Sequence, residues 1–142
     1  LTVAENLEVG RRAARGHAAW TPERLFEIFP NLAAMRGRRA AAMSGGEQQM
    51  LAIARTLMGN PDAVLLDEPS EGLAPVILEL MAEAVLSMKR EGIAVLLSEQ
   101  NFDFAAAVAD RAYVIERGEI RYDGSMAALE ADPALRAQFL TI

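Results

Sequence analysis

The stretch "MSGGEQQMLAIARTLMGNPDAVLLDEPSEGLAP", residues 43–75, decides the fold. It opens with two glycines in front of a strong helix pattern, although glycine inside a helix costs roughly 1 kcal/mol relative to alanine. Ser44 and Glu47 have the spacing of a capping box, which places the glycines at the mouth of the helix. Open backbone N–H groups and the positive end of the helix dipole attract anions. The stretch therefore predicts a helix N-terminus that binds a phosphate.

A buried strand and two carboxylates follow the helix. We expect the helix over residues 46–58, with a stop at the "GNP" that follows, and a short apolar strand over 63–66. Such a run is typical of a parallel strand covered on both faces. It would end at Asp67 and Glu68, where ligands of α/β sheets bind, with Asp67 suited to Mg²⁺ and Glu68 to an attacking water. The alternative is a strand that runs into an ordinary acidic turn.

The rest of the chain supplies further helices and strands. The patterns and capping residues predict helices over 2–15, 21–29, 31–39, 74–91 and 103–109, a strand over 93–97, a β-hairpin joined across Arg117 and Gly118, and two closing helices capped by Ser125 and Asp132. The order strand, helix, strand, helix, hairpin predicts an α/β fold with a parallel core. Because two apolar parallel strands are too few for a stable sheet, we expect their neighbours upstream of Leu1 or in another chain.

Composition narrows the function. The chain has 142 residues, a net charge of −6 and no cysteine. The negative charge argues against a general nucleic-acid surface, and the lack of cysteine excludes disulfides and thiol catalysis. Two short arginine clusters, at residues 11–15 and 36–39, are either solvated faces or contacts to an anion or a partner. No apolar run approaches the roughly 20 residues of a membrane span.

The quoted stretch resembles the signature motif, Walker B strand and D-loop of the ATP-binding cassette (ABC) ATPases, and the resemblance extends over essentially the whole chain. "GGEQQMLAIAR", "EGLAP" and "SEQN" are most similar to the ATP-binding subunits of importers for branched-chain amino acids. The resemblance implies a partial P-loop NTPase fold, with a helical subdomain region over 1–43 and the C-terminal part of the α/β ATPase core over 44–142. It also implies ATP and Mg²⁺ as ligands.

The resemblance assigns roles to individual residues. The signature motif, which in this family contacts the γ-phosphate of ATP held by the opposite subunit of a head-to-tail dimer, corresponds to Ser44, Gly45, Gly46, Glu47 and Gln48. Asp67 corresponds to the Walker B aspartate, which holds Mg²⁺ directly or through water, and Glu68 to the catalytic glutamate. Gln100 occupies the switch position, where histidine is common, and Ala74 ends the D-loop where aspartate is common. Glutamine can donate to a phosphate oxygen but cannot carry a proton as imidazole does.

One family element is absent from the sequence. A phosphate-cradling loop is Gly-rich and ends in Lys-Ser or Lys-Thr, whereas the only lysine here is Lys89 in "SMKREG". We therefore expect the chain to be the C-terminal part of a longer ATPase, inactive toward MgATP alone and prone to associate.

The resemblance also implies partners and a location. It implies a second ATPase subunit, membrane permease subunits, an indirect link to a substrate-binding protein, no nucleic-acid partner, and a position on the inner face of the cell membrane. Two alternatives stay open: a non-transport cassette ATPase that acts on DNA or on the ribosome, and a non-catalytic module that offers its signature helix to another ATPase.

Overall fold

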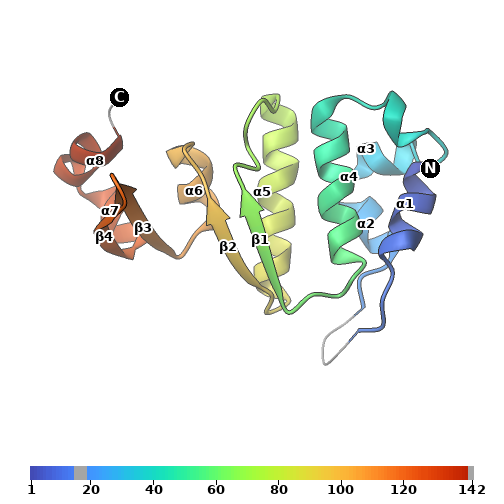
Figure 1. Ribbon diagram of the computed structural model, residues 1–142, viewed down its shortest axis with the longest axis horizontal. Helices are drawn as coiled ribbons and strands as arrows, with labels where there is room; N and C mark the ends of the chain where they lie inside the picture. Colours follow the sequence, from blue (N-terminus) through green and yellow to red (C-terminus); the bar gives the residue numbers. More distant parts are fainter. Residues whose placement is uncertain (15–18, 141–142) are drawn as a thin grey trace.

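The computed structural model describes residues 1–14 and 19–140, and it begins with a group of helices (Figure 1). These are α1 (Val3–Gly10), α2 (Pro22–Ile28), α3 (Pro30–Ala34), a short 3₁₀ turn (Ala40–Ala42) and α4 (Gly45–Leu57). Thr2 and Thr21 cap the first two through their hydroxyls, as the sequence predicts, and Pro22 occupies the first turn of α2.

An α/β region follows α4. Its elements are β1 (Ala63–Asp67), α5 (Pro75–Arg90), β2 (Ala94–Ser98), α6 (Phe102–Val108), β3 (Arg111–Glu116), β4 (Glu119–Ser125), α7 (Met126–Ala131) and α8 (Pro133–Leu140). Strands β1 and β2 pair in parallel across the α5 crossover, and β3 and β4 form an antiparallel hairpin. The α/β class, the parallel pair and the hairpin are confirmed. Within the described residues, no helix is long and apolar enough to cross a membrane.

The parallel pair is covered on one face only. Val64 and Leu66 are buried and belong to the apolar core, together with Met81 and Val85 of α5. On the opposite face Leu65 and Leu96 are 78% and 64% exposed. The prediction that these strands are covered on both faces is therefore wrong for this chain, because no described element packs on the second face.

The helix predicted over 2–15 ends earlier. α1 stops at Gly10 because the chain turns there against α4: a Cβ on Gly10 would lie 2.3 Å from the carbonyl oxygen of Arg55. The N–H of Arg12 then donates to the carbonyl of Met58 at 3.0 Å instead of continuing the helix. Arg15, the predicted end of the helix, lies outside the described residues.

The third predicted helix, 31–39, is also shorter. It ends at Ala34, and the carbonyl groups of the residues that follow accept hydrogen bonds from the start of α1. Arg36 and Arg38 accept from the N–H groups of Ala4 and Val3, each at 3.0 Å. These bonds satisfy donors that the first turn of α1 cannot pair internally.

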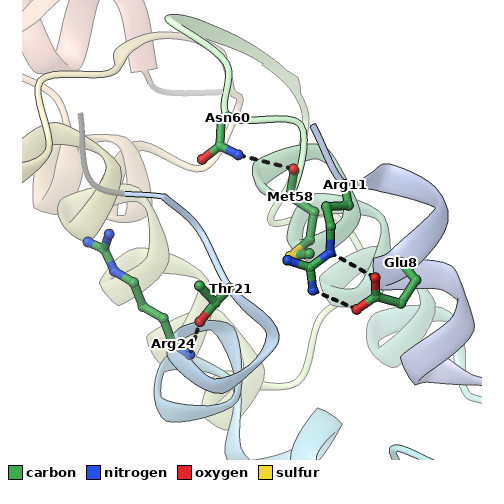
Figure 2. Close-up of polar contacts among 6 residues, drawn as sticks. All are labelled: Glu8, Arg11, Thr21, Arg24, Met58 and Asn60. Atoms are coloured by element: carbon green, nitrogen blue, oxygen red, sulfur yellow. Dashed lines mark hydrogen bonds and ion pairs between the residues drawn. The ribbon is translucent and has the colours of Figure 1, made fainter. Parts of the chain in front are cut away.

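Asn60 joins the segment after α1 to the end of α4. Its backbone is left-handed, with φ of 50°, a conformation that asparagine tolerates better than most residues. The side chain amide donates to the carbonyls of Arg12 at 2.7 Å and Met58 at 3.4 Å, and its oxygen accepts from the N–H of Trp20 at 2.8 Å. Figure 2 shows the bond from this amide to the Met58 carbonyl and, separately, the Glu8–Arg11 ion pair. The buried Asn60 thus closes the connection between α1 and α2.

Candidate functional site

The mouth of α4 has the predicted capping box. Ser44 Oγ accepts from the N–H of Glu47 at 3.4 Å, and Glu47 Oε2 accepts from the N–H of Ser44 at 2.7 Å. Ser44 and Gly45 are exposed, and a Cβ on Gly45 would meet nothing within 4 Å. The first turn of α4 is therefore open to an approaching anion.

Gly46 and Gln48, two further residues of the predicted phosphate site, have structural contacts of their own. A Cβ on Gly46 would lie 3.0 Å from Leu73 and 3.8 Å from Ile77, so a glycine here lets the segment after β1 pack against α4. The Gln48 amide donates to the carbonyls of Ala40 and Met43 at 3.1 and 3.3 Å, which braces the chain before the helix. That residues 44–48 contact a phosphate stays a prediction.

The acidic pair lies at the end of β1, as the sequence predicts. Asp67 is the last residue of the strand, is exposed and pairs in register with Ser98. Glu68 follows with a left-handed φ of 44°, a conformation that costs a non-glycine residue roughly 1–2 kcal/mol. Its N–H donates to the carbonyl of Ser98 at 2.8 Å. The pairing of β1 with β2 therefore extends one residue beyond the strands and fixes the Glu68 backbone.

Pairing of the strands also brings Gln100 to Glu68. The Gln100 amide donates to Glu68 Oε1 at 2.6 Å, although the two residues are 32 positions apart. The family resemblance implies that both residues act in one reaction, and the structure places their side chains in direct contact.

Two site residues were missed by the sequence analysis. Glu99 accepts from the N–H of Ser70 at 2.8 Å and from that of Asn101 at 3.0 Å, using one carboxylate oxygen for each. The Gln49 amide donates to the carbonyl of Pro69 at 2.8 Å. For Glu99 the available signal was its position: it follows an apolar strand, as the acidic pair does. Nothing in the pattern distinguishes Gln49 from its neighbour in α4.

The helix mouth and the acidic pair lie on one side of the molecule. Figure 1 shows the N-terminus of α4 and the carboxyl ends of β1 and β2 directed toward the same edge. The contacts of Gln49 with Pro69 and of Gly46 with Leu73 join the two parts directly. This edge thus presents donors suited to a phosphate next to carboxylates suited to a cation and a water.

The donor set fits a magnesium ion that is shared with a phosphate ligand. Within the described residues, no group of three or more histidine and carboxylate side chains could hold a metal ion. Asp67 supplies one exposed carboxylate, and Mg²⁺ is usually bound through one or two carboxylates, several waters and the phosphates of a substrate.

The capping box makes stability depend on pH. Hydrogen bonds from the backbone and the hydroxyl of Ser44 hold the pKa of Glu47 below its ordinary value. A depressed folded-state pKa adds stability that is present above the unfolded pKa, about 4.3, and is lost as the pH falls through the folded value. As the pH falls from about 5 to about 3, we expect the free energy of unfolding to decrease less in Glu47→Gln than in the unmodified protein. Urea unfolding at each pH measures this free energy. Glu79→Gln, an exposed change on α5, is the control; equal pH dependence in all three proteins would contradict the role of this cap.

The sequence of this chain is similar to a protein family and to two known relatives. The family model described as "ABC transporter" matches residues 1–71. The high-affinity branched-chain amino acid transport ATP-binding protein BraG of Pseudomonas aeruginosa is 45% identical over 141 residues, which cover 99% of this chain and 60% of that protein. The probable branched-chain amino acid transport ATP-binding protein LivF of Archaeoglobus fulgidus is 33% identical over 135 residues, covering 88% of this chain and 54% of that protein.

A solved structure has the same fold. The crystal structure of a nucleotide-free ATP-binding cassette from an ABC transporter superimposes with a TM-score of 0.73 and 28% identity, covering all of this chain and 64% of that one. The chain thus spans somewhat more than half the length of the proteins that it matches.

Proposed function

Because this chain belongs to the ABC transporter family, we propose that it forms part of an ATP-binding subunit that hydrolyses MgATP to drive the import of branched-chain amino acids. The 45% identity to BraG supports this substrate class. The 142 residues contain no Gly-rich loop that ends in Lys-Ser or Lys-Thr, so we assign the cradle for the nucleotide phosphates to residues outside this chain.

The observation that carries the proposal is the contact between Glu68 and Gln100 beside Asp67. The side chains of Glu68 and Gln100 meet where two parallel strands end, although they are 32 positions apart, and Asp67 is the residue directly before Glu68. Ligands of open α/β sheets bind at this edge. An ordinary acidic turn would need no amide from the turn that follows the neighbouring strand.

In this proposal each residue has one task. Asp67 would hold a magnesium ion, which would neutralise charge on the phosphates. Glu68 orients the attacking water and accepts its proton through the carboxylate oxygen that Gln100 leaves free. Gln100 donates to a phosphate oxygen when nucleotide is present. The open first turn of α4, with Ser44 and Gly45, contacts the γ-phosphate of ATP held by a second ATPase subunit.

The proposed partners follow from this task. A second ATPase subunit completes each site in a head-to-tail dimer. The conformational change that accompanies ATP binding and hydrolysis is transmitted to membrane permease subunits. A substrate-binding protein takes part indirectly, and the subunit sits on the inner face of the cell membrane. The name of BraG supports a role in amino acid transport, and these partners are the ones that such transport requires.

Substitution of Ser44 tests the proposed contact with phosphate. In a complete subunit that joins this chain to a phosphate-binding loop, we expect Ser44→Glu to lower the MgATP hydrolysis rate about 100-fold, because a carboxylate replaces a donor at the γ-phosphate. The measurement is steady-state phosphate release.

Ser125→Glu is the matched control for this experiment. Ser125 caps α7 by accepting from Ala128 at 3.1 Å, as Ser44 caps α4, so both variants lose a similar helix cap. We expect the Ser125 variant to keep at least about half of the wild-type rate. Equal rates for the two variants would mean that Ser44 acts only as a cap.

A further inference from the structure

Glu99 connects the two turns that carry the proposed reactive residues. One of its carboxylate oxygens accepts from the N–H of Ser70, two residues after Glu68, at 2.8 Å. The other accepts from the N–H of Asn101, directly after Gln100, at 3.0 Å. A single half-buried carboxylate therefore joins the turn after β1 to the turn after β2.

The turn after β1 is held at each of its first three residues. Glu68 donates its N–H to Ser98, and Pro69 accepts from Gln49 of α4. Ser70 donates its N–H to Glu99, which lies directly after β2, so this contact holds the backbone of the turn while the Gln100 amide holds the Glu68 side chain. Left-handed backbone at a non-glycine residue persists where the surroundings over-determine it, and Glu68 has such a backbone.

We propose that Glu99 is a positioning residue for hydrolysis, which holds Glu68 and Gln100 in register with each other by bridging the backbone of Ser70 and Asn101. This inference rests on the proposed function, because it assigns to Glu68 the attacking water. Glu99 itself need not touch the nucleotide. Its carboxylate fixes the backbone positions from which the side chains of Glu68 and Gln100 extend.

The chemistry of the bridge requires a carboxylate of this length. Each oxygen accepts from one N–H, and an amide in its place offers one acceptor and one NH₂ group, which would face a backbone donor. Aspartate keeps the charge and both oxygens but is one methylene shorter, so from the same backbone position its carboxylate does not reach the N–H groups of both Ser70 and Asn101. Both changes should loosen the register of Glu68 against Gln100.

The first experiment measures single-turnover hydrolysis by the complete subunit, with enzyme in excess over MgATP. We expect Glu99→Gln to lower the rate constant at least about tenfold with an unchanged amplitude, since a displacement near 1 Å of a reacting group can cost that much or more. Glu99→Asp is expected to slow the step as well. Glu79→Gln, which makes the same chemical change on the exposed side of α5, is expected to match the wild type.

The second experiment needs no nucleotide. Exchange of the Ser70 amide hydrogen, followed by NMR in the nucleotide-free protein, should accelerate at least about tenfold in Glu99→Gln and stay unchanged in Glu79→Gln. A slower reaction of Glu99→Gln without faster exchange of the Ser70 amide would overturn the proposal, because the bridged turn would then be unchanged. So would a Glu99 variant that matches Glu79→Gln in both experiments.

Glu68→Gln in the same series separates the two levels of inference. If Glu68→Gln is slow and Glu99→Gln is as fast as the wild type, the positioning role is wrong and the proposed function stands. If Glu68→Gln is itself as fast as the wild type, the assignment of the water to Glu68 fails, and the role of Glu99 fails with it.

Discussion

Glu68→Gln in the complete subunit is expected to reduce the turnover of MgATP by about 100- to 10,000-fold, the range that a general base contributes. The amide cannot accept the proton of the attacking water, while the side chain keeps its length and its place beside Gln100, which donates to Glu68 Oε1 at 2.6 Å. Binding of ATP should change little, because the proposed phosphate and metal contacts come from other residues. Phosphate release measures turnover, and equilibrium dialysis measures binding.

The control for this variant is Glu79→Gln, which removes one exposed carboxylate from α5 and leaves the strand ends intact. It should hydrolyse ATP at the wild-type rate. A Glu68→Gln protein that keeps more than about a tenth of the wild-type turnover would contradict the role of Glu68 as a general base. Loss of ATP binding together with turnover would instead point to a damaged fold at the end of β1.

Gly10→Ala is expected to lower the free energy of unfolding by about 2 kcal/mol. The added methyl group would lie 2.3 Å from the carbonyl oxygen of Arg55 and 2.8 Å from its Cγ, where α1 meets α4. Overpacking of this kind costs roughly 1–3 kcal/mol and occasionally more, and a contact with backbone places it at the upper end. The better helix propensity of alanine offsets roughly 1 kcal/mol. Equilibrium urea unfolding of the complete subunit measures the difference.

Gly37→Ala is the matched control in the same helical region. A Cβ at Gly37 would meet nothing within 4 Å, and its φ is not left-handed, so we expect a change within about 0.5 kcal/mol. If Gly10→Ala proves as stable as Gly37→Ala, α1 does not press on α4 as closely as the structure shows.

Local sequence predicted the starts of the helices well. The capping boxes at Thr2 and Ser44 are both present, and α4 begins at Gly45, one residue before the predicted start. Ser125 caps α7 as predicted. These interactions join residues three apart, so they form wherever the helix forms and need no information from the rest of the chain.

The ends of the helices and the covering of the strand faces were predicted less well. α1 stops at Gly10 because of a contact with Arg55, 45 positions away, and residues 35–39 leave the helix to pair with the start of α1. The apolar composition of the strands predicted that both of their faces are covered, yet Leu65 is exposed. Composition shows that a strand can be buried, but burial depends on which elements are present to pack against it. The division of the chain at residues 43 and 44 stays a prediction.

The amino-acid sequence was sufficient for the α/β class and for the capped glycine mouth of α4, because each depends on neighbours in the chain or on the order of local patterns. The roles of Asp67, Glu68 and Gln100 rest on the family resemblance and stay predictions. The sequence could not show that Glu99 bridges Ser70 and Asn101, or that Gln49 holds Pro69. The contacts with Ser70 and Pro69 arise from the register of β1 on β2 and from the packing of α4 beside them. Register and packing belong to the folded chain as a whole, since they bring a side chain to a backbone group that is 20 or more positions away.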